Sequence, residues 1–523
     1  MQPFNLPILS TLLLTCVFAS VLIGLLPSAK KSTEEIAIIC RNWALGFSGL
    51  ILLLSFTIFH FDFSSSAQGL QLVETYQWLG HISYFKLGVD SLSVSMVLLL
   101  ALLLPVVILA SHSAACKGKA KLYYSLLFLL VASVFGVFLA QDMLFFFVFW
   151  ELELLPMYLL ISIWGGQNRL KAANKFLLFT FTAGAFLLAG ILLLFFLSHA
   201  DPGKRTFLML EASNSFRALQ STGILSQSPA ITQLIFILFL IGFCIKLPSI
   251  PLHTWLPEAH VEAPTAISML LAGILLKMGG YGLIRFGTEF FPQALSELAP
   301  WIGLLGAINI VGAAIFCLVQ DDMKRVIAYS SVSHMGFVLL GLATLSSQGI
   351  NGAIFQMFSH GIISAGLFAA IGVIYDRGHT RLISNFSGLA LRMPVFFFLF
   401  LGLAMANLGL PALSGFVGES MIFYATFTSG SNFSMLQLAT LIGTIGVVIT
   451  AAYMLWLGKR LFFGEEKPQW QGFSDLNLSE RMVLGSLFTA ALLLGVLPRL
   501  LTDKLETGSN YMSEMIASSA STK

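Results

Sequence analysis

Two lysines and two glutamates lie inside stretches that are otherwise almost entirely apolar. Lys246 falls in the run ITQLIFILFLIGFCIKLPSIPLHTWL, and Lys277 falls in AISMLLAGILLKMGGYGLI. Glu151 falls in FFFVFWELELLPMYLL, and Glu419 falls in LGLPALSGFVGESMIF. A charged side chain at the centre of a bilayer costs roughly 2.5–3.5 kcal/mol on insertion scales. A chain that keeps four such groups is therefore expected to move charge through a membrane.

Lys246 and Glu151 have the chemistry of a proton switch. A buried lysine holds its proton more tightly when a carboxylate approaches it and releases the proton more easily when the carboxylate withdraws. Glu153 is two positions from Glu151, about 200° around an ideal helix, so the two carboxylates are not expected to face the same side. We choose Glu151 as the functional partner and give Glu153 a supporting role. The alternative is a static ion pair that only stabilises the fold.

The other candidates for proton transfer lie further along the chain. Lys277 is surrounded by glycines, which predicts close helix packing or a water-lined setting. His334 in SSVSHMGF and His360 in QMFSHGII titrate near neutral pH and suit a proton relay, although buried histidines are also often purely structural. Glu419 fits a terminal carrier or gate. His253, together with His260, is expected to line a loop or channel mouth.

The sequence contains no recognisable metal or redox site. Its five cysteines are scattered without a CxxC pair, so we expect no disulfide framework, iron–sulfur ligation or zinc site. The sequence also lacks an HxxxH motif and paired carboxylates at metal-ligand spacing, so we expect no other kind of metal site. The prediction is that the chain has no redox catalytic residue, no metal and no cofactor of its own.

These residues must be positioned by membrane helices. Of the 523 residues, 57% are hydrophobic and only 10% are charged, whereas soluble domains carry about 25% charged residues. The apolar runs are about 20 residues long and do not alternate as barrel strands do, which favours helices. The net charge of +3 is too small to indicate nucleic-acid binding. The fold class is therefore an all-α integral membrane protein with many spans.

About fourteen transmembrane helices are expected. The first run lacks a basic leader and is interpreted as a retained span. Basic residues concentrate in alternate loops, which predicts that those loops are cytoplasmic and that both termini lie on the other side. The expected spans are 8–27, 36–60, 88–112, 121–140, 142–164, 170–198, 231–256, 265–287, 300–319, 326–345, 350–374, 393–425, 433–462 and 481–500.

Two of these spans contain helix-breaking residues beside a buried charge. Pro248 and Pro251 follow Lys246, and Pro411 with its neighbouring glycines precedes Glu419. Backbone groups freed by proline survive at membrane depth only inside protein or beside water, and paired broken spans are typical of transporters built from inverted repeats. The breaks fall in the fourth helix of the unit 4–8 and in the fourth helix of the unit 9–13. This agreement predicts two inverted five-helix repeats. The expected domains are an N-terminal three-helix segment (1–120), a first repeat (121–290), a second inverted repeat (291–462) and a C-terminal helix and tail (463–523).

Several motifs resemble a known family in the same order along nearly the whole chain. WELELLPMYLLISIWGG, the stretch from IKLPSIPLHTWLPEAHVEAP to LLKMGGYGLIR, RVIAYSSVSHMGF, FSHGIISAGLF and LPALSGFVGE are similar to the antiporter-like proton-pumping subunit 4 (subunit M or D) of complex I. WELEL followed by WGG most resembles the cyanobacterial and chloroplast type-I NAD(P)H dehydrogenase branch. The resemblance leaves open a respiratory, cyclic-electron-flow or carbon dioxide uptake form.

The resemblance implies that redox chemistry and proton translocation belong to different subunits. Iron–sulfur clusters and a quinone such as plastoquinone would belong to partner subunits, and this chain would translocate protons as the quinone is reduced. Glu151 and Lys246 would form a coupled pair, Lys277 with His334 and His360 a central axis, and Glu419 the exit. The implied location is a thylakoid or bacterial inner membrane, with neighbouring antiporter-like subunits as partners. The alternative is a sodium/proton antiporter subunit of the Mrp type.

Overall fold

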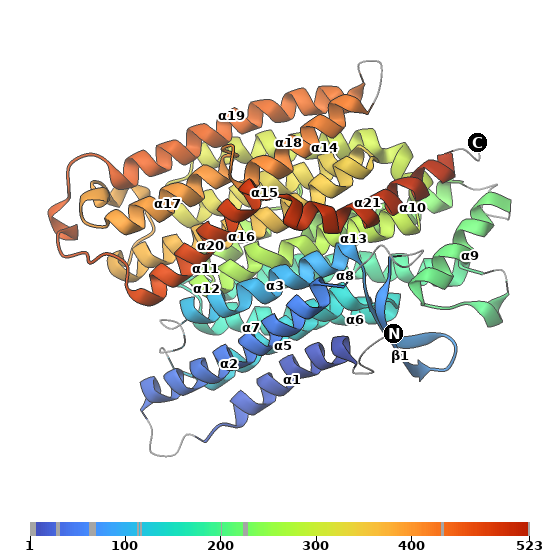
Figure 1. Ribbon diagram of the computed structural model, residues 1–523, viewed down its shortest axis with the longest axis horizontal. Helices are drawn as coiled ribbons and strands as arrows, with labels where there is room; N and C mark the ends of the chain where they lie inside the picture. The colour runs from blue at the N-terminus through green and yellow to red at the C-terminus, as the bar shows by residue number, and fades with distance from the viewer. Residues whose placement is uncertain are drawn as a thin grey trace.

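Long apolar helices make up most of the molecule. The structure is a computed structural model that describes residues 7–27, 32–61, 69–111, 115, 118–199, 201–222, 229–429 and 434–520. Figure 1 shows the helices lying side by side in a slab, from α1 and α2 at one edge to α18 and α19 at the other. The helices and strands, in chain order, are α1 (Ile8–Leu25), α2 (Thr33–Phe59), β1 (Gln71–Leu79), β2 (Ser83–Val89), α3 (Ser91–Ala110), α5 (Ala120–Leu139), α6 (Met143–Leu152), α7 (Leu154–Trp164), α8 (Arg169–Leu197), α9 (Met209–Thr222), α10 (Pro229–Lys246), α11 (Trp255–Glu262), α12 (Thr265–Leu270), the π-helical turn η4 (Leu271–Leu275), α13 (Leu276–Glu289), α14 (Pro292–Leu318), α15 (Met323–Ala343), α16 (Ser347–Gly378), α17 (Pro394–Asn407), α18 (Ser414–Thr428), α19 (Met435–Phe462), α20 (Leu478–Val496) and α21 (Arg499–Ala520).

The membrane fold is confirmed. Among the described residues, 12 helical segments are long and apolar enough to cross a membrane, and α10 and α17 are shorter apolar helices. Apart from the antiparallel β1–β2 hairpin, the described fold is all-α, as predicted. The count of about fourteen spans stays a prediction, because α10 and α17 are each too short to be counted alone.

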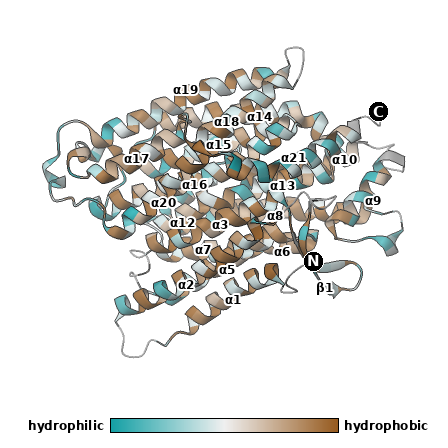
Figure 2. Cartoon of the chain, in the orientation of Figure 1, coloured by the Kyte–Doolittle hydropathy of each residue, from teal (hydrophilic) through white to brown (hydrophobic). Residues whose placement is uncertain are grey.

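The helices at the centre of the slab are more deeply buried than those at its rim. The apolar windows of α16 and of the segment 265–289 are 100% buried, whereas that of α20 is only 22% buried. Figure 2 shows hydrophobic residues along most of the helices and hydrophilic ones gathered at the two ends of the bundle. The segment 265–289, α15 and α16 therefore form a protein-enclosed core, and the outer helices present apolar side chains to lipid.

Both predicted breaks are confirmed. The chain leaves helical geometry between α10 and α11, and again between α17 and α18. Two further irregularities were not predicted. The expected span 142–164 is interrupted at Glu153, between α6 and α7, and the expected span 265–287 contains the π-helical turn η4.

Two aspartates support the predicted inverted repeat. Asp142 accepts hydrogen bonds from two backbone N–H groups at the start of α6, and Asp322 does the same at the start of α15. In each case the next residue donates its N–H to a carbonyl in a distant loop, that of Phe207 or that of Arg381. Figure 1 places β1 and α9, beside the first cap, at the opposite end of the bundle from the start of α17, beside the second. The same aspartate cap therefore occurs once in each predicted repeat and at opposite ends of the bundle, as an inverted repeat requires. The four domain boundaries stay a prediction.

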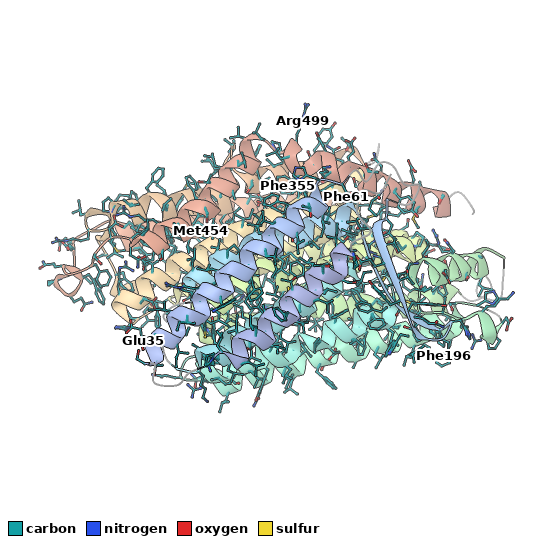
Figure 3. All side chains as sticks on the ribbon, turned by 60° about the horizontal axis from the view of Figure 1, so that its bottom comes forward. Glu35, Phe61, Phe196, Phe355, Met454 and Arg499 are labelled. Atoms are coloured by element: carbon teal, nitrogen blue, oxygen red, sulfur yellow. The ribbon has the colours of Figure 1, made fainter. Side chains whose placement is uncertain are left out.

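The residues beyond 498, which were expected only as a tail, are helical. They form α21, which is too polar to be a span but buries Leu501, Leu505, Met512 and Ile516 at helical spacing against α3, α14 and α16. Figure 3 shows Arg499, where α21 begins, on the same side of the bundle as Phe61. The β1–β2 hairpin and α9 were likewise missed, because both lie in polar linkers that periodicity alone does not resolve.

Candidate functional site

The helix that carries Lys246 ends at that residue. After α10 the chain turns through Pro248 and Pro251 before α11 begins at Trp255. Proline leaves helical carbonyls without partners, and here the indole N–H of Trp255 donates to one of them at 2.9 Å. The side-chain oxygen of Asn309 accepts an N–H from the turn at 2.8 Å. The break is therefore held in place by neighbouring helices, and it puts the Lys246 ammonium at a helix C-terminus, where a cation is favoured.

The carboxylate in contact with Lys246 is Glu153, and not Glu151 as expected. The two side chains form a fully buried ion pair. As expected, the two carboxylates face different sides of the segment, Glu153 towards Lys246 of α10 and Glu151 towards Gly184 of α8. The expectation was wrong only about which of the two meets the lysine. The supporting role given to Glu153 becomes direct contact with the lysine.

Glu151 lies close by without sharing that contact. Its side chain is half-buried, and its Oε1 has no hydrogen-bond partner among the described residues. It rests against Gly184 of α8, where a Cβ would overlap the carboxylate. It remains within electrostatic range of Lys246, whose ammonium also lies 5.5 Å from the ring of Trp150. One lysine therefore has two carboxylates within reach, one of them in contact.

Lys277 is placed by an irregular helix. It follows the π-helical turn η4, where the hydrogen bonds step out of the α-helical register, and its ammonium donates to the carbonyl of Ala272. Two residues further on, a Cβ on Gly279 would lie 2.6 Å from the backbone nitrogen of Leu247, so α13 packs directly on the end of α10. Lys246 and Lys277 thus lie on adjoining backbones, although no direct contact joins them in the part of the chain that is described.

Four buried side chains from four helices form a row, which we call the central row. Nζ of Lys277 lies 2.7 Å from Nδ1 of His360 on α16. The ring of His360 is 5.4 Å from that of His334 on α15, centroid to centroid. Nδ1 of His334 lies 3.4 Å from Oε1 of Glu419 on α18. All four residues are at most 6% exposed, so the row runs through protein and not along its surface.

Glu419 reaches the row because α18 starts anew after the second break. The break between α17 and α18 contains Pro411, and Gly409 there has a φ of +76°, which favours glycine. The carboxylate of Glu419 rests against Gly409, where a Cβ would lie 2.6 Å from Oε2. The break therefore makes room for the carboxylate beside His334.

Several polar atoms around the central row have no partner. Among the described residues, Nε2 of His334, Nε2 of His360, Oε1 of Gln356 and Nδ2 of Asn407 make no hydrogen bond. All four side chains border the same small gap between helices next to the second break. Buried polar groups are nearly always paired, and an unpaired one costs roughly 1–3 kcal/mol. Keeping four of them together points to a function for this place and not to stability.

The two histidines near the first break, His253 and His260, lie in different surroundings. His253 lies in the turn before α11 and stacks against Phe316 of α14, with centroids 6.0 Å apart. His260, also expected at a channel mouth, is fully buried on α11, stacks on Phe368 at 4.3 Å, and lies within electrostatic range of Lys277. Sequence reasoning expected His260 only at a loop or channel mouth and did not count it among the residues that carry protons. The seven-residue spacing of the two histidines across HTWLPEAH was the available signal.

The geometry therefore gathers the candidates into two groups. The first contains Glu151, Glu153 and Lys246, and the second is the central row. Both hold groups that accept and release protons at membrane depth, and α10 and α13 touch between them. This arrangement suits proton transfer along the bundle, with charge on one group altering the proton affinity of the next.

Comparison with known proteins finds one matching family model and relatives that are similar over nearly the full length. Residues 140–450 match the family model described as "NADH:quinone oxidoreductase/Mrp antiporter, TM". NAD(P)H-quinone oxidoreductase chain 4 1 of Synechococcus elongatus is 41% identical over 517 residues, covering 98% of this chain and 92% of the relative. NADH-quinone oxidoreductase subunit M of Rhodobacter capsulatus is 39% identical over 489 residues, covering 93% and 91%. A chain of respiratory complex I from Thermus thermophilus with bound NADH superposes with a TM-score of 0.83 at 27% identity, covering 97% and 99%.

Proposed function

The chain belongs to the NADH:quinone oxidoreductase/Mrp antiporter family of membrane proteins, and we propose that it is the proton-translocating membrane subunit of an NAD(P)H:quinone oxidoreductase. It contributes to that enzyme as a subunit without redox chemistry of its own. Its task is to move protons across the membrane as quinone is reduced elsewhere in the complex.

The observation that carries this function is the unbroken central row. Lys277, His360, His334 and Glu419 place a titratable group on each of four helices, at separations that side-chain rotation or one water molecule spans. A row of ionisable groups at membrane depth is costly and is retained where protons or ions pass. Each group can receive a proton from one neighbour and give it to the next.

The first group is assigned the role of a switch. Lys246 holds a proton firmly while Glu153 is in contact, because the ion pair favours the ammonium. When the lysine withdraws from Glu153 that stabilisation is lost, and the proton passes to Oε1 of Glu151, which has no hydrogen-bond partner among the described residues, leaving a neutral amine and a neutral carboxylic acid. Glu151 is thus kept as a functional residue beside Glu153. Glu419 serves the exit at the other end of the row.

The alternative within the same family is a sodium/proton antiporter subunit of the Mrp type. Full-length identity of 39–41% to subunits of quinone oxidoreductases favours the first function. The two functions differ in their energy source. Proton movement that requires electron transfer to quinone and persists without sodium supports the first, whereas sodium-dependent proton exchange without an electron donor supports the second.

The partners and location follow as part of the proposal. Neighbouring antiporter-like membrane subunits flank the chain, and peripheral subunits hold the iron–sulfur clusters and the quinone site. No cofactor is assigned to this chain. A cyanobacterial or plastid thylakoid membrane is proposed, or a bacterial inner membrane, with both termini on the lumenal or periplasmic side and with a role in respiration, cyclic electron flow or carbon dioxide uptake.

The test uses the assembled complex in sealed membrane vesicles. Lys246→Ala is expected to lower proton translocation per quinone reduced, while the complex still assembles, because the switch has lost its proton carrier. The exposed Lys459→Ala at the end of α19 is the matched control and pumps as the unmodified complex does. Undiminished pumping by a fully assembled Lys246→Ala complex would rule out Lys246 as a proton carrier.

A further inference from the structure

The turn that follows Lys246 is bonded to a helix of the predicted second repeat. The N–H of Ile250 in this turn donates to Oδ1 of Asn309 on α14 at 2.8 Å, and Asn309 is fully buried. Three residues further along the same face of α14, a Cβ on Gly312 would lie 3.0 Å from Cδ1 of Ile250. Ile250 is therefore held to α14 by its backbone and by its side chain, and a shift of the first break either moves α14 or breaks the hydrogen bond.

The amide of Asn309 uses only one of its two ends. A backbone N–H can only donate, so Asn309 has to present its oxygen to Ile250. Its Nδ2 is buried as well and has no hydrogen-bond partner among the described residues. An unpaired buried donor lowers the stability of the fold, and such groups are rare. The bond to the first break is therefore kept together with an unsatisfied donor, which points to a role for Asn309 beyond stability.

The next residue of α14 is bonded to α15. The carbonyl of Ile310 accepts a hydrogen bond from the hydroxyl of Ser333 at 2.8 Å. The backbones of the two helices also touch, because a Cβ on Gly306 would lie only 2.7 Å from the carbonyl oxygen of Gly336. Closely packed elements resist compression and pass displacements on to their neighbours. A displacement of α14 is therefore expected to move α15 as well.

The contacts lead to the central row at His334. This histidine directly follows Ser333 on α15, and its Nδ1 lies 3.4 Å from Oε1 of Glu419 on α18. An N–H···O hydrogen bond usually measures about 2.7–3.2 Å, so the observed distance is just longer than an ordinary bond. A displacement of α15 by a few tenths of an ångström therefore decides whether His334 and Glu419 are hydrogen-bonded.

We propose that Asn309 and Ser333 couple the first break to His334 of the central row. When Lys246 leaves its carboxylate partner, the end of α10 shifts, and the turn after it carries α14 along through Asn309. Ser333 passes that shift to α15, so the distance from His334 to Glu419 changes. No proton travels along this link. Asn309 and Ser333 are positioning residues, and they act on the proton route through the helices that they join.

The inference rests on the proposed function, because Lys246 must change its contacts during pumping for the link to matter. It adds a connection that the proton route itself does not contain. Protons enter the central row at Lys277, whereas the link acts at the other end, on the contact between His334 and Glu419. The exit would then open in one state of Lys246 and close in the other, which prevents protons from leaking through the row between pumping steps.

The decisive variant is Ser333→Ala, which removes only the hydroxyl that reaches α14. Ser331→Ala is the matched control, because Ser331 is equally buried on the same helix but donates to the carbonyl of Ile327 in that helix. The measurement is protons moved per quinone reduced by the assembled complex in sealed vesicles. Ser333→Ala is expected to cause about half or more of the loss caused by Lys246→Ala, as residues in coupling networks do, while quinone reduction continues. Ser331→Ala should leave the ratio unchanged.

Asn309 gives an independent readout. Asn309→Leu keeps the size of the side chain but cannot accept the N–H of Ile250, so it is expected to lower the same ratio. Combined with Ser333→Ala, it should cause no greater loss than the more severe single variant, because one link can be cut only once. Two merely structural defects would instead multiply. If Asn309→Leu prevents assembly, the comparison of Ser333→Ala with Ser331→Ala decides alone.

The outcomes separate the two proposals. If Lys246→Ala lowers pumping but Ser333→Ala does not, the link is wrong and the proposed function stands. If Ser331→Ala lowers pumping as much as Ser333→Ala, the loss is a general response of α15 and the link is again wrong. If neither Lys246→Ala nor Lys277→Ala affects pumping, the proposed function itself is wrong. If Lys246→Ala and Ser333→Ala both lower pumping and Ser331→Ala does not, both proposals are supported.

Discussion

Nζ of Lys277 lies 2.7 Å from Nδ1 of His360, and this contact joins the two halves of the molecule. In the predicted division of the chain, Lys277 belongs to the last helix of the first repeat, and His360 to the middle helix of the second. The other contacts of the central row lie within the second half. A proton that passes along the row from the first half to the second must cross here.

Replacing His360 tests that crossing. His360→Gln keeps a polar side chain of similar size but cannot carry a proton as an imidazole does, so proton flux along the row is expected to fall about 100-fold, the lower range for loss of an acid–base group. The measurement is light- or donor-driven acidification of sealed vesicles, normalised to quinone reduction. His379→Gln, at the exposed C-terminus of α16, should behave as the unmodified protein. Equal pumping by the His360 variant would remove the histidine from the row.

The two glutamates beside Lys246 should respond differently to neutralisation. Glu153→Gln breaks a fully buried ion pair, a change that typically costs about 3–5 kcal/mol, so the purified complex should melt at a lower temperature. Glu151→Gln removes a carboxylate that is not in contact with the lysine, so the melting temperature should stay nearly unchanged while pumping falls. Thermal unfolding of the detergent-solubilised complex measures the first effect and vesicle acidification the second. Similar melting temperatures for the two variants would contradict the direct contact.

Glu419 is expected to exchange protons with His334. Oε1 of Glu419 lies 3.4 Å from Nδ1 of His334, and Glu419→Gln keeps the size of the side chain but removes the carboxylate that can accept a proton. The number of protons translocated per quinone reduced should therefore fall. Acidification of sealed vesicles measures this, with the exposed Glu465→Gln as the control. Undiminished pumping by an assembled Glu419→Gln complex would remove Glu419 from the central row.

Asp321, outside the spans, gives the stability a pH dependence. Partial burial acts to raise the pKa of Asp321, but hydrogen bonds from Ser384 and the nearby Arg460 outweigh it and hold the pKa below the usual 3.8. A carboxyl whose pKa is lowered by folding contributes its stability above its unfolded pKa and loses it as the pH falls through the folded value. Asp321→Asn should therefore lower the melting temperature at pH 6, with the difference shrinking below about pH 4. Asp503→Asn, an exposed aspartate on α21, should show no such convergence.

The sequence predicted the elements that depend on composition and spacing. The long apolar runs, the two broken spans and the buried Lys246, Lys277, His334, His360 and Glu419 could all be read from it, because membrane burial and proline act locally. The partner of Lys246 could not, because spacing shows only that Glu151 and Glu153 face different sides, and which side meets Lys246 depends on how the helices pack. The interruption between α6 and α7 did have a local signal in Pro156, which has no N–H to donate to the carbonyl of Leu152. α21 was missed for a related reason: a helix that lies on a surface needs only a few apolar residues on one face.

The position of α21 has a mechanical consequence. It packs against α3, α13, α14 and α16, so one rigid rod bridges helices that belong to different parts of the chain. Closely packed side chains resist compression and pass strain on to their neighbours. Any spreading of the two halves at this end must therefore bend or detach the rod. At the opposite end the halves are joined differently, by Arg381 and Lys324 donating to the carbonyls of Val261 and Ala263. A few hydrogen bonds can exchange one at a time, whereas a packed helix has to move as a unit, so the two ends are expected to differ in stiffness.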